Sequence, residues 1–341
     1  MNTEKQPLIS VLLPVHNSEQ YLRDAVESIL SQTYKNFELL ILISATTSKE
    51  SRDILSAFVD QRIRRIERTP DEVMVKALHR GIKEAKGKYI ARMDSDDISL
   101  PDRLAQQVEF MEKNRKIGVC GTWYTTIGAG KPFTNKFPVD FDDIRANMLF
   151  QTSFAHPSTM FRKSLFEKFH LNYNRDLTYG EDYDLWLRCA EHFPMANIPK
   201  VLLHYRVHQK SASQVFKQET GETAYRVRSD MLKKMNIEQT DEEKRLHNFL
   251  LPKDGEDIAD FLAKQENWLI KILTANQTTL VYKPESLDKA IYERWRIVCG
   301  FNTKERFAVW KKYRSSPLFK IGSRKKYWDG MKILVKGLLK K

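Results

Sequence analysis

The sequence has no long apolar run, and cysteine is scarce. No uninterrupted apolar stretch approaches the roughly 20 residues that a membrane-spanning helix needs. The first residues also do not have the basic-then-apolar order of a secretory signal peptide. Cys120, Cys189 and Cys299 are widely separated and odd in number, which argues against a disulfide framework and against a thiolate zinc site. We therefore expect a cytoplasmic protein with reduced cysteines.

A glycine-rich phosphate loop is also missing. The first apolar run, residues 8–15, leads into Asn17 and Ser18 without the glycine patterns of a P-loop or a dinucleotide fold. One function to consider is that of a nucleotidyltransferase. Such an enzyme would normally need a glycine-rich loop for its triphosphate, so the sequence disfavours this function. A strand that enters a tight turn and a helix still favours phosphate binding at the start of that helix.

Acidic residues are outnumbered, and the excess of positive charge lies near the end of the sequence. The 341 residues include 57 Lys and Arg against 44 Asp and Glu, a formal net charge of +13. From Lys320 onward only Asp329 opposes a series of cations: Lys320, Arg324, Lys325, Lys326, Lys332, Lys336, Lys340 and Lys341. This terminal location, without regularly interleaved aromatic residues, disfavours a nucleic-acid-binding or other non-catalytic polyanion-binding module.

The same terminal segment has an amphipathic pattern. Its apolar residues share one helical face, and lysines lie along another; the apolar set is Trp328, Met331, Val335, Leu338 and Leu339. This pattern is typical of a helix that lies on an anionic membrane surface. The solvated face of an ordinary terminal helix is the alternative. If the membrane interpretation holds, the protein is peripheral at the inner face of the membrane.

Strand and helix patterns alternate through the first part of the chain. Apolar runs at 8–15, 37–43 and 63–67 predict strands, and a helical pattern that Gly87 closes precedes a fourth. Such alternation predicts an α/β fold with a mostly parallel sheet. Helical patterns replace it beyond about Val215. We predict an α/β catalytic domain over 1–215 and a helical, basic region over 216–341.

Three acids follow the fourth strand within four residues. Asp94, Asp96 and Asp97 repel one another unless a cation lies among them, and hard oxygen ligands suit Mg²⁺ or Mn²⁺. The carboxyl ends of strands are also where α/β sheets bind ligands. A solvated acidic turn is the alternative, with Asp97 or Ser99 capping a helix that opens at Pro101.

A second acidic group starts a later helix. Gly180 permits a close backbone approach there, and Glu181, Asp182 and Asp184 occupy the first helical turn. Acids in this position complement the helix dipole, which suffices to explain Asp184.

Four motifs in this order resemble those of family 2 glycosyltransferases, which have the GT-A fold. They are Pro14-Val15-His16-Asn17, Ser28-Ile29-Leu30-Ser31-Gln32-Thr33-Tyr34, Ala77-Leu78-His79-Arg80-Gly81-Ile82 with Gly87-Lys88-Tyr89-Ile90, and Asp94-Ser95-Asp96-Asp97. The match covers roughly the first two-thirds of the chain. The resemblance implies metal-dependent sugar transfer from a nucleotide-diphosphate donor, with inversion at the anomeric carbon. Growing surface glycans, lipid-linked ones included, are the acceptors it implies.

The resemblance also assigns the donor site. It implies that residues at two strand ends line the nucleotide pocket: Pro14, Val15, Asn17, Asp94 and Ser95, with Asp94 facing the ribose. Asp96 would bind the Mn²⁺ or Mg²⁺ that bridges the diphosphate. The segment His204-Tyr205-Arg206-Val207-His208-Gln209-Lys210-Ser211 resembles the part that folds over the diphosphate. There His208 would be a metal ligand, and Arg206 or Lys210 a phosphate contact.

On the acceptor side, the resemblance makes Asp182 the general base and Glu181 an acceptor contact or orienting group. His156, before Pro157, is either a substrate contact or a structural hydrogen-bonding residue. The second strand departs from the family, in which it usually ends in an Asp-Asp-Gly-Ser-Thr type sequence. Here Ser44 or Thr46 would contact the base instead, and a neutral hydroxyl binds less strongly than a carboxylate. A UDP-sugar remains the favoured donor.

Overall fold

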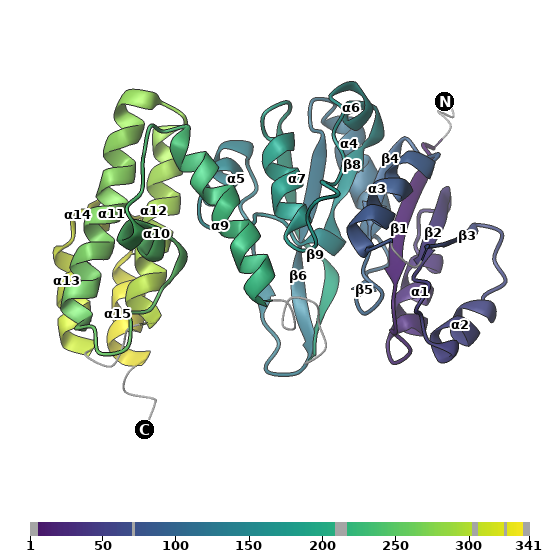
Figure 1. The fold of residues 1–341 in the computed structure, drawn as a ribbon, viewed down its shortest axis with the longest axis horizontal. Coiled ribbons are helices and arrows are strands. Elements are labelled where there is room, and N and C mark those ends of the chain that lie inside the picture. Colours follow the sequence, from purple (N-terminus) through teal and green to yellow (C-terminus); the bar gives the residue numbers. More distant parts are fainter. Residues whose placement is uncertain (1–5, 70–71, 209–216, 302–305, 324–325, 337–341) are drawn as a thin grey trace. The chain divides into compact units, whose positions relative to one another are not determined.

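The computed structural model describes residues 6–69, 72–208, 217–301, 306–323 and 326–336. The chain forms two compact units, the first from residues 1–144 and 152–224 and the second from 145–151 and 225–341. In Figure 1, strands and helices alternate through the first unit, and only helices are drawn from α9 onward. The functional division into 1–215 and 216–341 stays a prediction.

The first unit is built on one nine-stranded sheet. Its strands, in spatial order, are β3 (Ile63–Glu67), β2 (Phe37–Ile43), β1 (Ile9–Val15), β4 (Tyr89–Arg92), β8 (Met160–Arg162), β6 (Val119–Gly128), β9 (Met195–Val207) and β5 (Ile98–Ser99), with β7 (Thr134–Asn135) paired to β6. From β3 to β4 all pairs are parallel. β8 is antiparallel to both of its neighbours, and β6 and β9 are parallel. The predicted α/β fold is confirmed.

Helices cover this sheet. They are α1 (Leu22–Leu30), α2 (Lys49–Ser56), α3 (Met74–Glu84), α4 (Arg103–Lys113), α6 (Lys163–Lys168) and α7 (Glu181–Cys189), with the short helix η1 (His156–Ser158) and with α5 (Phe141–Asn147), which reaches into the second unit. Every residue of β1 and β2 is buried, as expected of parallel strands covered on both faces. Burial of each Val, Leu or Ile side chain stabilises the fold by about 1.5–3 kcal/mol relative to an exposed one.

Gly87 has a different role from the one predicted. α3 ends at Glu84 with Ala85 as its C-cap, so the prediction that Gly87 closes this helix is wrong. A Cβ at Gly87 would lie 2.5 Å from the backbone nitrogen of Ser10 and 2.8 Å from the carbonyl oxygen of Leu8. The glycine is required because the chain passes directly against β1 before it enters β4.

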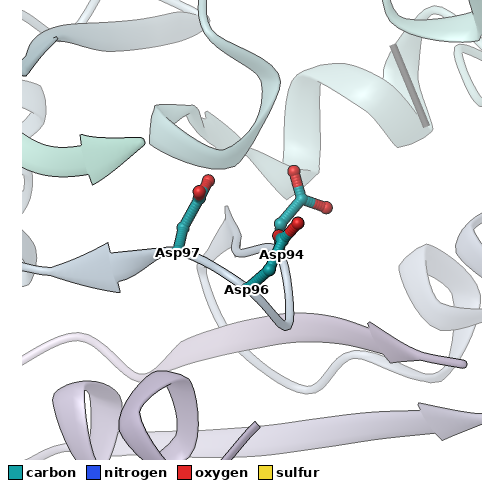
Figure 2. A group of neighbouring side chains, drawn as sticks. All are labelled: Asp94, Asp96 and Asp97. Atoms are coloured by element: carbon teal, nitrogen blue, oxygen red, sulfur yellow. The ribbon is translucent and has the colours of Figure 1, made fainter. Parts of the chain in front are cut away.

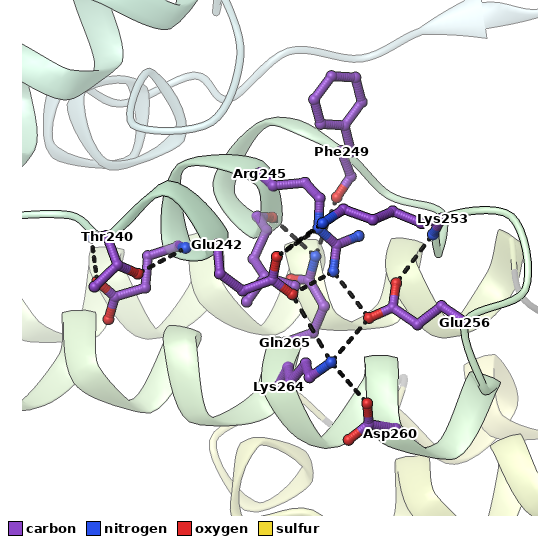
Figure 3. A network of polar contacts seen from close by, with 11 residues as sticks. Thr240, Glu242, Arg245, Phe249, Lys253, Glu256, Asp260, Lys264 and Gln265 are labelled. Carbon is purple, nitrogen blue, oxygen red and sulfur yellow. Dashed lines mark hydrogen bonds and ion pairs between the residues drawn. The ribbon is translucent and has the colours of Figure 1, made fainter.

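The second unit is helical. Its helices are α9 (Lys217–Lys233), which starts in the first unit, α10 (Asp241–Asn248), α11 (Ile258–Thr279), α12 (Pro284–Phe301), α13 (Arg306–Ser315), α14 (Pro317–Lys320) and α15 (Lys326–Lys336). An ion-pair network joins α10 to α11: Arg245 contacts Glu242 and Glu256, and Lys264 contacts Glu256 at 3.1 Å (Figure 3). Within the described ranges, no helix has the length and apolar character needed to cross a membrane.

Residues 145–151 belong to this second unit although they precede much of the sheet in sequence. The buried His247 ring contacts the carbonyl oxygen of Leu149 at 2.9 Å, and Arg228 donates to that of Phe150 at 2.7 Å. Arg294 lies over the Phe150 ring. No sequence pattern indicated that this segment would leave the sheet domain to pack with helices more than seventy positions away.

Candidate active site

The parallel strands bring the predicted donor-side residues to one edge of the sheet. Val15 is aligned with Ile43, and Leu12 with Arg92, so β1, β2 and β4 end at the same edge. The turns that follow these strands contain Asn17, Ser44 and Asp94. This is the edge at which α/β sheets bind ligands.

Hydrogen bonds hold the turns after β1 and β2 together. Asn17, with a left-handed φ of 45°, accepts a bond from the backbone nitrogen of Ser48 at 2.7 Å. The Ser44 hydroxyl lies 3.2 Å from that of Thr46. Pro14 and Val15 are buried within β1, whereas the Asn17 side chain is exposed. Among Pro14, Val15 and Asn17, the three predicted nucleotide contacts of this motif, Asn17 therefore presents a polar side chain to solvent.

The acidic turn after β4 collects three carboxylates. Asp94, Asp96 and Asp97 each place a carboxylate oxygen within 4.8 Å of the others (Figure 2). The hydroxyl of Ser95 lies 2.6 Å from that of Ser18, which ties this turn to the one after β1. The predicted Asp94-Ser95-Asp96 motif is thus tied to the turn after β1 at the sheet edge.

The electrostatics of this turn favour a cation. Burial, followed by the charge of Asp94, raises the pKa of Asp96, and burial with the charges of Asp94 and Asp96 raises the pKa of Asp97 well above its usual value. Among the described groups, one Asp97 carboxylate oxygen is buried without a hydrogen-bond partner. These clustered, partly desolvated carboxylates, with the His208 imidazole 2.8 Å from Asp96, form a set of ligands that fits Mn²⁺ or Mg²⁺.

Asp97 and Ser99 do not cap the following helix, so that alternative is wrong. α4 begins after Asp102, whose side chain makes no capping bond. Asp97 instead accepts a hydrogen bond from the backbone nitrogen of Arg206 at 2.8 Å. Ser99 is held by Gln32, whose side-chain nitrogen is 3.1 Å from its hydroxyl. Both residues connect the turn to other parts of the sheet domain.

The end of β9 lies on the acidic turn. His208 Nε2 is 2.8 Å from Asp96 Oδ2, and Arg206 Nε donates to the carbonyl oxygen of Asp96 at 2.7 Å. The Arg206 guanidinium also lies 4.3 Å from the centre of the Tyr21 ring and 3.7 Å from Asp24. The structure therefore brings both residues to the acidic turn, and their roles as metal ligand and phosphate contact stay predictions. Lys210 lies outside the described residues.

The second acidic group begins α7. Gly180 is the N-cap residue, with a left-handed φ of 74° that favours glycine. Glu181 is buried, and burial with the charge of Asp182 raises its pKa to about 8. Burial also raises the pKa of the partly exposed Asp182 to about 6. Asp184 pairs with Arg188 at 2.7 Å on the same helix, a structural role.

Two residues that the sequence reasoning missed, Arg92 and Tyr173, interact electrostatically with both acidic groups. Arg92 ends β4, is almost fully buried and contacts Asp94 at 2.6 Å. Its charge and that of Asp94 act on Glu181 and Asp182, so both acidic groups share one electrostatic environment. An arginine inside an otherwise apolar strand, two positions before Asp94, was the signal for Arg92. No comparable sequence pattern indicated a role for Tyr173.

Comparison with known proteins identifies the family. The family model described as "Glycosyl transferase family 2" matches residues 10–169. The O-antigen biosynthesis glycosyltransferase WbnJ of Escherichia coli is 35% identical over 214 residues, which cover 60% of this chain and 81% of WbnJ. An uncharacterized glycosyltransferase of Haemophilus influenzae is 30% identical over 243 residues, covering 67% of this chain and 74% of that protein.

Solved structures share the fold at low sequence identity. S. aureus TarS in complex with UDP-GlcNAc has a TM-score of 0.56 at 14% identity, with 96% of this chain and 89% of that one covered. The mannosyltransferase PcManGT of Pyrobaculum calidifontis, in complex with GDP-Man and Mn²⁺, has a TM-score of 0.54 at 15% identity, covering 99% and 89%. The chain belongs to glycosyl transferase family 2, and it is a glycosyltransferase with a GT-A fold.

Proposed function

We propose that this protein is a metal-dependent, inverting glycosyltransferase of cell-surface polysaccharide synthesis. It transfers a sugar from a nucleoside-diphosphate donor to a hydroxyl group of a glycan or lipid-linked acceptor. The observation that carries the proposal is the contact of His208 with Asp96 in a turn that holds three carboxylates. The likeness to an O-antigen glycosyltransferase supports the surface-glycan role.

The donor binds at the edge formed by β1, β2 and β4. The turn after β1 and Ser44 contact the nucleobase, Asp94 and Ser95 face the ribose, and Arg206 contacts the diphosphate. TarS and PcManGT bind a UDP-sugar and a GDP-sugar. A UDP-sugar remains the favoured donor for this chain, although Ser44 stands where the family usually has an acid.

Asp96 and His208 would hold Mn²⁺ or Mg²⁺, with the carboxylates of Asp94 and Asp97 nearby. A bound divalent ion neutralises charge that develops on the leaving diphosphate. The chain's own contribution is to fix these ligands: the Ser18–Ser95 contact orients the turn, and Asp97 anchors it to β9 through Arg206.

Asp182 acts as the general base. With a pKa of about 6 it is mostly ionised at neutral pH and can take the proton of the attacking hydroxyl. Glu181, with a pKa of about 8, keeps its proton at neutral pH and is therefore a poor base. A carboxylic acid both donates and accepts hydrogen bonds, which suits it to binding a sugar hydroxyl.

The C-terminal helix gives the enzyme a peripheral attachment to an anionic membrane. α15 is fixed through Asp329, which accepts a bond from the Tyr292 hydroxyl at 3.1 Å, and through the buried Ile333. Trp328, Met331 and Val335 are 73%, 51% and 41% exposed. Apolar side chains left in solvent on a lysine-rich helix favour an interface with anionic lipid. Leu338, Leu339 and the last lysines lie outside the described residues.

A thermal-shift screen of UDP- and GDP-sugars, with and without Mn²⁺, tests the enzymatic proposal. We expect stabilisation only when a nucleotide sugar and Mn²⁺ are both present. Stabilisation by nucleoside triphosphates alone would favour a nucleotidyltransferase, and stabilisation by polyanions alone a binding protein. The anomeric configuration of the product, determined by NMR, tests inversion.

A further inference from the structure

Two side chains outside the acidic motifs, one of them buried and one largely buried, lie near Glu181. His156, on η1, places Nε2 2.7 Å from the Tyr173 hydroxyl and Nδ1 3.7 Å from Oε1 of Glu181. The Tyr173 side chain is buried, and the His156 side chain is 11% exposed. The imidazole is therefore within hydrogen-bond distance of the Tyr173 hydroxyl and lies beside the acid at the start of α7, without a hydrogen bond to it.

We propose that His156 and Tyr173 are positioning residues that fix the Glu181 carboxyl for binding the acceptor sugar, so that the acceptor hydroxyl meets Asp182. The inference rests on the proposed function, because it assigns the acceptor side of the same site. It goes further by explaining a histidine that the sequence left undecided between substrate contact and structural residue.

Tyr173 is itself held in place by its backbone. Its carbonyl oxygen lies 3.0 Å from Nδ1 of His79 on α3. The neighbouring Asn172 donates to the carbonyl oxygen of His79 at 3.1 Å, and its own carbonyl oxygen accepts a bond from Arg188 of α7 at 2.8 Å. Contacts from α3 and α7 therefore fix the backbone around Tyr173, and this places the tyrosine hydroxyl against the His156 imidazole. Such support is what holds a binding group within a fraction of an ångström.

His156 is held equally well. The Thr159 hydroxyl donates to the carbonyl oxygen of His156 at 2.8 Å, and the next residue, Met160, pairs with Ala91 of β4. The ring also packs against Tyr173 and, edge-on, against Trp186 of α7. η1 thus ties the imidazole to the strand that leads into the acidic turn.

The charges around His156 and Tyr173 explain why a neutral imidazole fits here. Arg92 and Asp94 face Glu181 from the β4 side, and Asp182 faces it from its own helix. Burial, together with Arg92, lowers the pKa of His156 well below its usual value, so the ring is neutral. A neutral imidazole has one donor and one acceptor nitrogen, so Nε2 can hydrogen-bond the Tyr173 hydroxyl while Nδ1 faces the Glu181 carboxyl at 3.7 Å. No further charge is then buried.

Tyr173→Phe is the decisive variant, because it removes one hydroxyl and keeps the ring. Tyr34→Phe is the matched control, since the buried Tyr34 also donates a hydrogen bond, to the carbonyl oxygen of Pro7. Steady-state kinetics would use the nucleotide sugar selected by the screen and a panel of octyl glycosides as acceptors. Calorimetry would give the donor Kd, and thermal unfolding the Tm.

We expect Tyr173→Phe to lower kcat/KM for the acceptor about tenfold, the effect of one lost hydrogen bond. Donor Kd should stay within about twofold, and Tm should match that of Tyr34→Phe, since each variant loses one partly buried hydrogen bond. His156→Gln, which keeps a polar group near the position of Nε2, should retain more acceptor activity than His156→Ala. If His156 only supported the fold, two variants of equal Tm would not differ in acceptor activity in this order.

Wild-type acceptor kinetics in Tyr173→Phe would overturn the inference. So would a parallel loss of donor affinity and Tm, because the residue would then only support the fold. In either case transfer by the wild-type protein, together with an inactive Asp182→Asn variant, would leave the proposed function standing. Absence of transfer by the wild-type protein from every donor would overturn both.

Discussion

The Nε2 atom of His208 lies 2.8 Å from Oδ2 of Asp96, although 112 positions separate the two residues in the sequence. β9 makes this contact possible because it runs along the sheet to the acidic turn, where Asp97 accepts a bond from the backbone of Arg206. A carboxylate held by a neighbouring imidazole is ordered before any ligand binds. If this turn binds the donor as proposed, its diphosphate end is preorganised.

The first prediction concerns the metal. Asp96→Ala should abolish metal-dependent donor binding, because it removes the carboxylate that His208 orients. His208→Ala should weaken Mn²⁺-dependent binding on the order of 10–100-fold, the effect of residues that tune a metal site. Isothermal titration calorimetry with and without Mn²⁺ measures both. Asp53→Ala, which alters an exposed ion pair on α2, is the control. Unchanged nucleotide affinity and unchanged Mn²⁺ dependence in Asp96→Ala would show that Asp96 is not a metal ligand.

A second prediction follows from the raised pKa of Glu181. Its pKa is about 8 in the folded chain and about 4.5 in a solvated glutamate, so unfolding releases a proton between these values. The group therefore makes the free energy of unfolding fall as pH rises from about 4.5 to about 8. Glu181→Gln mimics the protonated acid and removes this loss. In EDTA, it should raise Tm by about 2 °C or more at pH 8.5, but not at pH 4.5.

Thermal unfolding monitored by circular dichroism at the two pH values tests this prediction. The exposed Glu27, which pairs with Arg23 on α1, provides the control variant Glu27→Gln. An equal change in Tm at both pH values, or a larger gain at the lower one, would mean that Glu181 does not hold a proton in the folded protein.

The third prediction concerns Gly87. Gly87→Ala should lower the free energy of unfolding by about 1–3 kcal/mol, because the new methyl group would collide with backbone atoms of β1. Gly300→Ala is the control, since this helical position has open space around it and alanine favours helix by about 1 kcal/mol. Urea unfolding compares the two. A Gly87→Ala variant as stable as wild type would show that the strand shifts at little cost.

A fourth prediction tests the membrane surface of α15. Replacing Trp328, Met331 and Val335 by serine should reduce sedimentation with phosphatidylserine liposomes and leave turnover of a soluble acceptor unchanged. Lys332→Glu should weaken binding further, since each basic side chain near such a surface contributes about 1 kcal/mol. Val59→Ser, at a position that is 97% exposed in the first unit, is the control. Deleting 320–341 is a less specific test, because it would also remove Tyr327, whose ring packs against Phe319. Unaltered liposome binding by the triple variant would rule out the membrane role.

The sheet domain was predictable because its first two strands, β1 and β2, are buried along their whole length. β1 and β2 are continuous apolar runs, and their parallel pairing determines which turns meet at the sheet edge. The order of the motifs then located the acidic turn and the start of α7. These inferences need only local patterns and the rule that ligands bind at the carboxyl ends of strands.

Contacts made by isolated polar residues were not predictable in the same way. Tyr173 reaches the site from an irregular segment, and its partners His79 and His156 lie 94 and 17 positions away. Gly87 was assigned to a helix end because glycine often occurs there, whereas its role depends on the distance to another strand. The packing of residues 145–151 with α10 likewise depends on tertiary contacts, which have no periodic signature in the sequence.

The last prediction is that Asp182 is the general base. In a single displacement, the acceptor hydroxyl attacks the anomeric carbon opposite the departing diphosphate, so a group on the acceptor side must take its proton. Asp96 is engaged with His208 on the donor side. Glu181 keeps its proton at neutral pH, whereas Asp182, with a pKa of about 6, is mostly ionised.

Asp182→Asn should therefore lower kcat by about 10²–10⁴-fold while donor affinity stays close to wild type, because the group acts mainly in the transition state. In the wild-type enzyme, kcat/KM should fall as pH drops below about 6, since protonation of Asp182 removes the base. Asp184→Asn is a matched control in the same helical turn, where the acid is paired with Arg188. If Asp182→Asn turned over at near wild-type kcat, the base would lie elsewhere, and Glu181→Gln would be the next variant to measure.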